Sequence, residues 1–185
     1  MAKTPSNMIP LGTQAPDFEL LDTTTGKFVH LLDLKSPKAT VIMFICNHCP
    51  FVLHIMDKVV KIAKEYHEKG INFIAISSND VTHYPDDSPE LMTEFAKKYH
   101  FNFPYLYDES QSVAKTYDAA CTPDFYVFDA LLHLVYRGQF DGSTPGNDTP
   151  TTGSSLTKAL DKILANKKPD TLQKPSVGCN IKWKK

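Results

Sequence analysis

An apolar segment that runs directly into a Cys-x-x-Cys sequence and then into an amphipathic segment constrains this chain more than any other feature. Residues 40–45 (TVIMFI) carry almost no polar side chains, which is typical of a central strand buried on both faces. Apolar residues then recur at three- and four-residue spacing over residues 52–66, and Gly70 ends the helix that this spacing predicts. Residues 71–76 form a second apolar strand. The order strand, helix, strand predicts an α/β domain.

The remaining segments extend this unit into a mixed sheet with helices around it. We expect an N-terminal hairpin formed by residues 18–21 and 28–31. A second pair of strands is expected at residues 124–129 and 132–137. Three further helices are expected at residues 91–99, 110–117 and 154–165. The predicted organisation is one domain over residues 1–166. Residues 167–185 form a C-terminal tail that either packs on the domain or is extended.

Composition excludes several classes of function. The 185 residues carry 20 Lys and Arg against 21 Asp and Glu, with Arg137 as the one arginine, so we expect no nucleic-acid partner. No apolar run approaches the ~20 residues that span a bilayer, so we expect no membrane contact. The N-terminal residues lack the apolar stretch of a secretory signal, which predicts a cytoplasmic protein. In that reducing compartment the four cysteines are expected to be catalytic or metal-binding rather than structural.

The spacing of Cys46 and Cys49 around Asn47 and His48 predicts redox chemistry. Only a thiolate is nucleophilic, and the N-terminus of a helix stabilises a negative charge. We expect Cys46 to lie at the open end of the junction and to attack a disulfide, and Cys49 to resolve the resulting mixed disulfide. His48, when protonated, would favour the thiolate, with Asn47 beside it.

Two other interpretations of the pair compete with this one. A Cys-x-x-Cys sequence is also half of a zinc site, but the other cysteines, Cys121 and Cys179, are 58 positions apart and do not form the second close pair. Two inert buried thiols are the remaining alternative. We therefore expect no metal and no cofactor.

Three segments resemble the thioredoxin-like superfamily, and within it the redoxin group that includes the alkyl hydroperoxide reductase C/thiol-specific antioxidant proteins. They are residues 12–18 (GTQAPDF), the Cys46–Cys49 segment, and Thr122-Pro123 before a strand. The resemblance implies a thioredoxin-like fold, with a central mixed sheet flanked by helices and an N-terminal hairpin extension. It also implies that Pro123 is cis, packs against the cysteine pair, and with Thr122 orients a bound chain.

The sequence departs from the peroxide-reducing members of this group. Cys49-Pro50 resembles their Cys-Pro motif, but Cys46 and Ile42 stand where the group has Thr or Ser and Pro, and Arg137 lies one strand too late. We therefore predict a thiol–disulfide oxidoreductase that acts on a disulfide-bearing protein or a small thiol and draws on a thiol reductant. The alternatives are peroxide reduction and a non-enzymatic binding module. A homodimer is the assembly that the resemblance suggests.

Two further thiols and one loop remain as candidates. Cys121 precedes Pro123 closely enough to lie near the pair, either as a third thiol or as a small buried side chain. Cys179 either resolves an oxidised cysteine or is simply a thiol in a docked tail, with Ile181 and Trp183 as apolar anchors. The acidic residues within 80–87 are expected to form a solvated loop.

Overall fold

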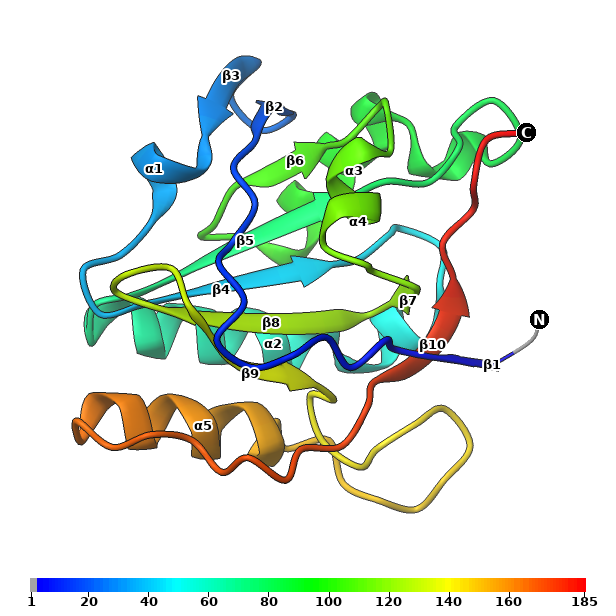
Figure 1. Cartoon of the computed structure of the whole chain (residues 1–185). Coiled ribbons are helices and arrows are strands. Elements are labelled where there is room, and N and C mark those ends of the chain that lie inside the picture. Colours follow the sequence, from blue (N-terminus) through cyan, green and yellow to red (C-terminus); the bar gives the residue numbers. More distant parts are fainter. Residues whose placement is uncertain (1–2) are drawn as a thin grey trace.

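The computed structural model describes residues 3–185 and is built on a seven-stranded mixed sheet in the order β3-β2-β6-β5-β4-β8-β9 (Figure 1). β4 (Ala39–Phe44) pairs in parallel with β5 (Ile71–Ser77) and antiparallel with β8 (Asp124–Asp129). The outer strands are β6 (Tyr105–Tyr107), β9 (Leu134–Gly138), β2 (Glu19–Asp22) and β3 (Lys27–His30). The predicted central mixed sheet is confirmed.

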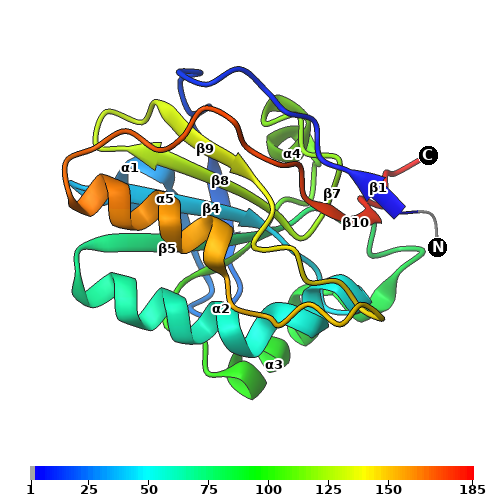
Figure 2. The same ribbon diagram turned by 90° about the horizontal axis from the view of Figure 1, so that it is seen from below.

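Alternate side chains of β4 face two separate apolar layers. Val41 and Met43 pack with α2 (Pro50–Glu68), α3 (Pro89–Tyr99) and α5 (Ser154–Leu164), which cover one face of the sheet (Figure 2). Ile42 and Phe44 pack on the other face, which is covered by α1 (Leu31–Leu34), α4 (Ser112–Thr116) and the N-terminal segment. This two-sided burial explains why the sequence of β4 is apolar except for Thr40.

The N-terminal hairpin is part of the sheet rather than an appendage to it. β2 pairs with β3 and also with β6, so the hairpin forms one edge of the seven strands. The short β6 was not expected from the sequence, since it has only three residues and follows a Phe-rich turn.

A second, three-stranded sheet joins the two ends of the chain. β10 (Val177–Asn180) pairs antiparallel with β1 (Lys3–Pro5) on one side and with β7 (Cys121–Thr122) on the other. This small sheet brings the end of the tail beside the loop that precedes β8. A 3-10 turn, η1 (Pro85–Asp87), lies in the acidic loop before α3.

Among the described residues, none of the helices combines the length and the apolar composition that crossing a bilayer would need.

The central strand supplies a direct test of this packing. We expect Ile42→Ala to lower the free energy of unfolding by about 2–5 kcal/mol, because Ile42 is fully buried and the truncation leaves a cavity. Leu172→Ala is the control, since Leu172 is 94% exposed and its loss should change the stability by less than about 0.5 kcal/mol. Urea unfolding followed by circular dichroism measures both; equal stabilities of the two variants would contradict the packing described.

Candidate active site

The cysteine pair lies in the turn between β4 and α2, as the sequence predicts. β4 ends at Phe44, and α2 begins at Pro50 with Cys49 in the N-cap position. Pro50 is tolerated there because the first N–H groups of a helix have no partner within it. Cys49 therefore sits at the positive end of a 19-residue helix.

Cys46 does not lie at an open edge, so this part of the sequence interpretation is wrong. Cys46 is 1% exposed and Cys49 is 0% exposed. The side chains between them, Asn47 and His48, are only partly buried. The reason is a tertiary contact, because β10 and the loop before β8 pack over the turn.

Thr122 contacts both sulfurs of the pair. Its Oγ1 lies 3.4 Å from Cys46 Sγ, and Cys49 in its thiol form donates through Sγ to the carbonyl oxygen of Thr122 at 3.2 Å. The Thr122–Pro123 peptide bond is cis, as expected. The structure thus brings together the Cys46–Cys49 segment and Thr122, which are far apart in the sequence.

A third thiol reaches the same point. Cys179 Sγ lies 2.8 Å from Cys49 Sγ, although 130 positions separate the two residues in the sequence. Cys179 pairs with Thr122 in the ladder between β10 and β7, which explains how the tail is directed at the pair. The same pairing occupies the backbone of Thr122 that was expected to orient a bound chain.

Among the three neighbouring thiols of Cys46, Cys49 and Cys179, that of Cys49 ionises most readily. The hydrogen bond from Cys46, followed by those from Cys179 and the backbone of Val52, lowers the pKa of Cys49 to about 5 despite its burial. The same bond to Cys49, together with burial and the nearby Asp87 carboxylate, raises the pKa of Cys46 well above its usual value. Cys49 therefore loses its proton more readily than Cys46.

The side chain of His48 is held by an acidic residue that sequence reasoning missed. His48 Nδ1 lies 2.8 Å from Asp87 Oδ2, and Asp87 is fully buried. This contact raises the pKa of His48, since the carboxylate favours the protonated ring. The ring also stacks on Tyr84 at a centroid distance of 5.9 Å. His48 thus carries its charge more readily than a free histidine.

Asp87 also fixes the backbone of the turn. Its Oδ1 accepts from the Asn47 N–H at 2.7 Å, and its Oδ2 accepts from Asn79 Nδ2 at 2.8 Å. The prediction that the acidic loop is solvated is wrong for Asp80 and Asp87, which are both buried. One signal could have found them, because this loop follows a strand parallel to the one before Cys46, and the carboxyl ends of parallel strands share an edge.

Asn47 is held on two sides and anchors the turn. Its Nδ2 donates to the carbonyl oxygen of Asp86 at 2.9 Å, and its Oδ1 accepts from the hydroxyl of Tyr105 at 3.0 Å. These contacts fix the loop between the cysteines rather than placing the amide against a sulfur.

Cys121 lies on β7, where it is fully buried. Its Sγ contacts the carbonyl oxygen of Pro123 at 3.9 Å, and burial raises its pKa strongly. These surroundings are those of a small apolar side chain rather than of a reactive thiol.

One group of side chains has the composition of a metal site. Potential ligand atoms of Cys46, His48 and Asp87 all lie within 4.8 Å of one another. The His48 and Asp87 atoms are already paired with each other, so a metal ion would have to break that contact.

Comparison with known proteins agrees with this arrangement. Residues 11–137 match the model of the AhpC/TSA family. The crystal structure of an uncharacterized conserved protein from Geobacillus kaustophilus is 56% identical, with a TM-score of 0.98 over 100% of this chain and 97% of that one. The thioredoxin domain of a thiol-disulfide oxidoreductase from Bacteroides vulgatus is 16% identical, with a TM-score of 0.62 over 81% of this chain and 97% of that one, which shows the fold.

A curated relative also carries a redox name. The thiol-disulfide oxidoreductase ResA of Halalkalibacterium halodurans is 29% identical over 107 residues, which are 57% of this chain and 55% of that protein. The match spans about half the length of that relative. The family model covers most of the chain, and with the fold and the thiol cluster it leads to one conclusion: the chain belongs to the AhpC/TSA family and has a thioredoxin-like fold.

Proposed function

We propose that this chain is a thiol–disulfide oxidoreductase that cycles Cys46 and Cys49 between dithiol and disulfide. The observation that carries the proposal is the position of both cysteines in one turn at the N-terminus of α2, where each sulfur contacts Thr122. A pair of this kind supplies both a nucleophile and a resolving group within one turn. The curated relative's name supports the same reaction class.

The reaction proceeds by two exchanges. Cys46 passes its proton to Cys49 and attacks one sulfur of a substrate disulfide, and the other substrate sulfur leaves as a thiolate that takes this proton. Cys49, again a thiolate, attacks Cys46 Sγ and expels the second substrate sulfur, which is protonated by solvent. The protein then holds the Cys46–Cys49 disulfide, and an external thiol reductant of the cytoplasm returns it to the dithiol.

His48 and Thr122 serve this reaction in different ways. A protonated His48, held by Asp87, lowers the cost of negative charge on the turn as Cys46 is deprotonated. Thr122 contacts both sulfurs and supplies, with Pro123, the backbone edge against which a substrate chain is oriented. A substrate chain that uses this edge displaces β10 from β7.

Peroxide reduction is the second candidate, and the thiolate at Cys49 favours it. In that reaction Cys49 attacks the peroxide, releases an alcohol or water, and becomes a sulfenic acid that a neighbouring thiol condenses with, releasing water. Arg137 is absent from the site, because it donates to the carbonyl oxygen of Ile9 and to Gln173. Stopped-flow reaction of the reduced protein with hydrogen peroxide and with oxidised glutathione separates the two candidates by which oxidant reacts faster.

The roles of the two cysteines are tested by serine variants. We expect Cys46→Ser to turn over disulfides more slowly than the wild type, because the thiol that attacks the substrate in this cycle is gone. We expect Cys49→Ser to accumulate a mixed disulfide on Cys46, because no thiolate resolves it. Mass spectrometry of the acid-quenched protein identifies the adduct. Cys121→Ser is the matched control and should keep wild-type turnover; wild-type turnover by Cys46→Ser would contradict the proposal.

The pair of His48 and Asp87 predicts a pH dependence. The raised pKa of His48 in the folded state means that the pair stabilises the fold fully below about pH 6.5 and that this stabilisation is lost as the pH rises through the raised value. Asp87→Asn should therefore lower the His48 pKa and cost about 1–3 kcal/mol at pH 6, with a smaller cost at pH 9. NMR titration of the ring and urea unfolding at the two pH values measure these effects.

Asp86→Asn is the control for this prediction, since Asp86 is an exposed neighbour whose side chain makes no ion pair among the described residues. A His48 pKa that is unchanged in Asp87→Asn, or lowered equally in Asp86→Asn, would contradict the assignment.

A further inference from the structure

The thiol of Cys179 lies closer to the pair than the proposed two-cysteine cycle requires. Its Sγ is 2.8 Å from Cys49 Sγ, and the residue is 3% exposed. Neither exchange step described above uses this thiol. The contact between Cys179 and Cys49 is therefore not explained by the two-cysteine cycle.

The chain is built so that β10 approaches the pair closely. A Cβ atom on Gly178 would overlap the carbonyl oxygen of Thr122, so only glycine allows β10 to lie this close to β7. The next residue is Cys179, which is paired with Thr122. The same carbonyl oxygen lies 3.2 Å from Cys49 Sγ. Thr122 thus sets the positions of both sulfurs.

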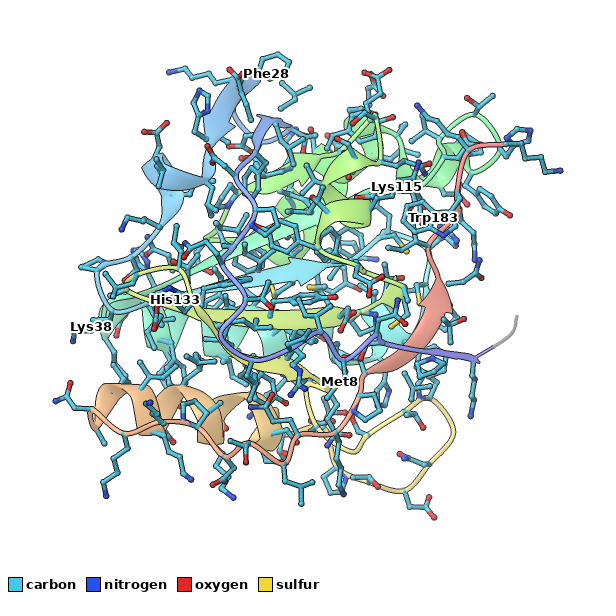
Figure 3. The ribbon with its side chains drawn as sticks, viewed as in Figure 1. Met8, Phe28, Lys38, Lys115, His133 and Trp183 are labelled. Carbon is cyan, nitrogen blue, oxygen red and sulfur yellow. The ribbon has the colours of Figure 1, made fainter. Side chains whose placement is uncertain are left out.

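The residues after β10 hold the tail in place. The N–H of Lys182 donates to Asn79 Oδ1 at 2.8 Å, and its carbonyl oxygen accepts from Gln111 Nε2 at 2.8 Å. Ile181 is buried on the second face of the sheet. Trp183 is 40% exposed, with the ammonium group of Lys115 5.8 Å from its ring centroid (Figure 3). Cys179 is therefore held at Cys49 by contacts on both sides of it.

We propose that Cys179 is a third redox-active thiol, which replaces Cys46 as the partner of Cys49 and forms a reversible Cys49–Cys179 disulfide. The proposal extends the function proposed above and rests on it for the source of the Cys46–Cys49 disulfide. β10 presents Cys179 along the same backbone edge that a substrate chain would use. In this arrangement the tail acts as an internal substrate.

The exchange balances without another reactant. Cys179 gives up its proton and attacks Cys49 Sγ, the Cys46–Cys49 bond breaks, and Cys46 leaves as a thiolate that takes the proton. One disulfide is lost and one is formed, so the oxidation state of the protein does not change. Cys46 is returned to the thiol form while the oxidising equivalent is stored between two buried sulfurs.

The rate of this exchange depends on pH in a defined direction. Burial, and then the contact with Cys49, raise the pKa of Cys179 to about 12. Since only its thiolate attacks, the rate of exchange should rise about tenfold for each pH unit over the neutral and mildly alkaline range.

Disulfide mapping of the Cys46→Ser variant tests the proposal. The reduced variant is treated with one equivalent of oxidised glutathione, quenched in acid, alkylated and digested with trypsin. We expect the loss of two hydrogen atoms from the protein and a peptide that links Cys49 to Cys179, with Cys121 alkylated. A stable glutathione adduct on Cys49 beside an alkylated Cys179 would overturn the proposal, as would a Cys121–Cys179 link.

A glycine variant tests the geometry with every other thiol in place. Adding Gly178→Ala to Cys46→Ser moves β10 away from Thr122, so the glutathione adduct on Cys49 should persist instead of the internal disulfide. Gly142→Ala in the same background is the control, because its Cβ would make only ordinary contact with Thr149. Equal yields of the internal disulfide in both double variants would contradict the positioning role of β10.

The mapping is independent of turnover, so the two proposals fail in distinguishable ways. If the wild type shows no disulfide turnover, the proposed Cys46–Cys49 cycle is contradicted, while the disulfide map of Cys46→Ser still tests the role of Cys179. If Cys46→Ser does not fold, the oxidised wild type is mapped instead, and a fraction with Cys46 alkylated and Cys49 linked to Cys179 is expected, which should form faster at higher pH. Its absence would overturn the proposal.

Discussion

The contacts of a single residue, Thr122, determine the arrangement of the active site. Its hydroxyl lies against Cys46, its carbonyl oxygen lies 3.2 Å from Cys49 Sγ, and its backbone pairs with Cys179. Three thiols from two distant parts of the sequence are therefore positioned by one residue beside a cis-proline. The seven-stranded sheet supports this arrangement, because β8 begins immediately after Pro123 and pairs with β4 along its whole length.

The electrostatics of the site follow from the burial of these thiols close to one another. Burial alone would keep every thiol protonated, but the neighbouring thiols and the N-terminus of α2 place a thiolate on Cys49. The Asp87 carboxylate opposes ionisation of Cys46, and it also raises the pKa of His48, whose protonated form compensates for that charge. The site is thus poised between two protonation states of one pair, which suits a reversible exchange.

The sequence predicts the local parts of this structure and misses the parts made by tertiary contacts. The strand, the Cys46–Cys49 turn and α2 follow from apolar periodicity, and the cis-proline follows from the family resemblance. β7 and β10 are too short to be recognised without each other. Asp87 looks like a solvated residue in a polar loop, but its carboxylate is paired with the backbone of Asn47, 40 positions earlier, and with the side chain of Asn79. The burial of Cys46 cannot be predicted locally, because it involves contacts such as that with Thr122, which lies 76 positions away in the sequence.

The central claim is that Cys49 belongs to a reversible redox couple, and a redox titration tests it most directly. The protein is equilibrated in dithiothreitol buffers of increasing oxidised fraction, quenched in acid and alkylated, and the accessibility of each thiol is read by mass spectrometry. The account predicts one reversible two-electron transition in which Cys49 becomes protected together with Cys46 or Cys179, while Cys121 is alkylated throughout. Full alkylation of Cys49 at every potential would contradict it.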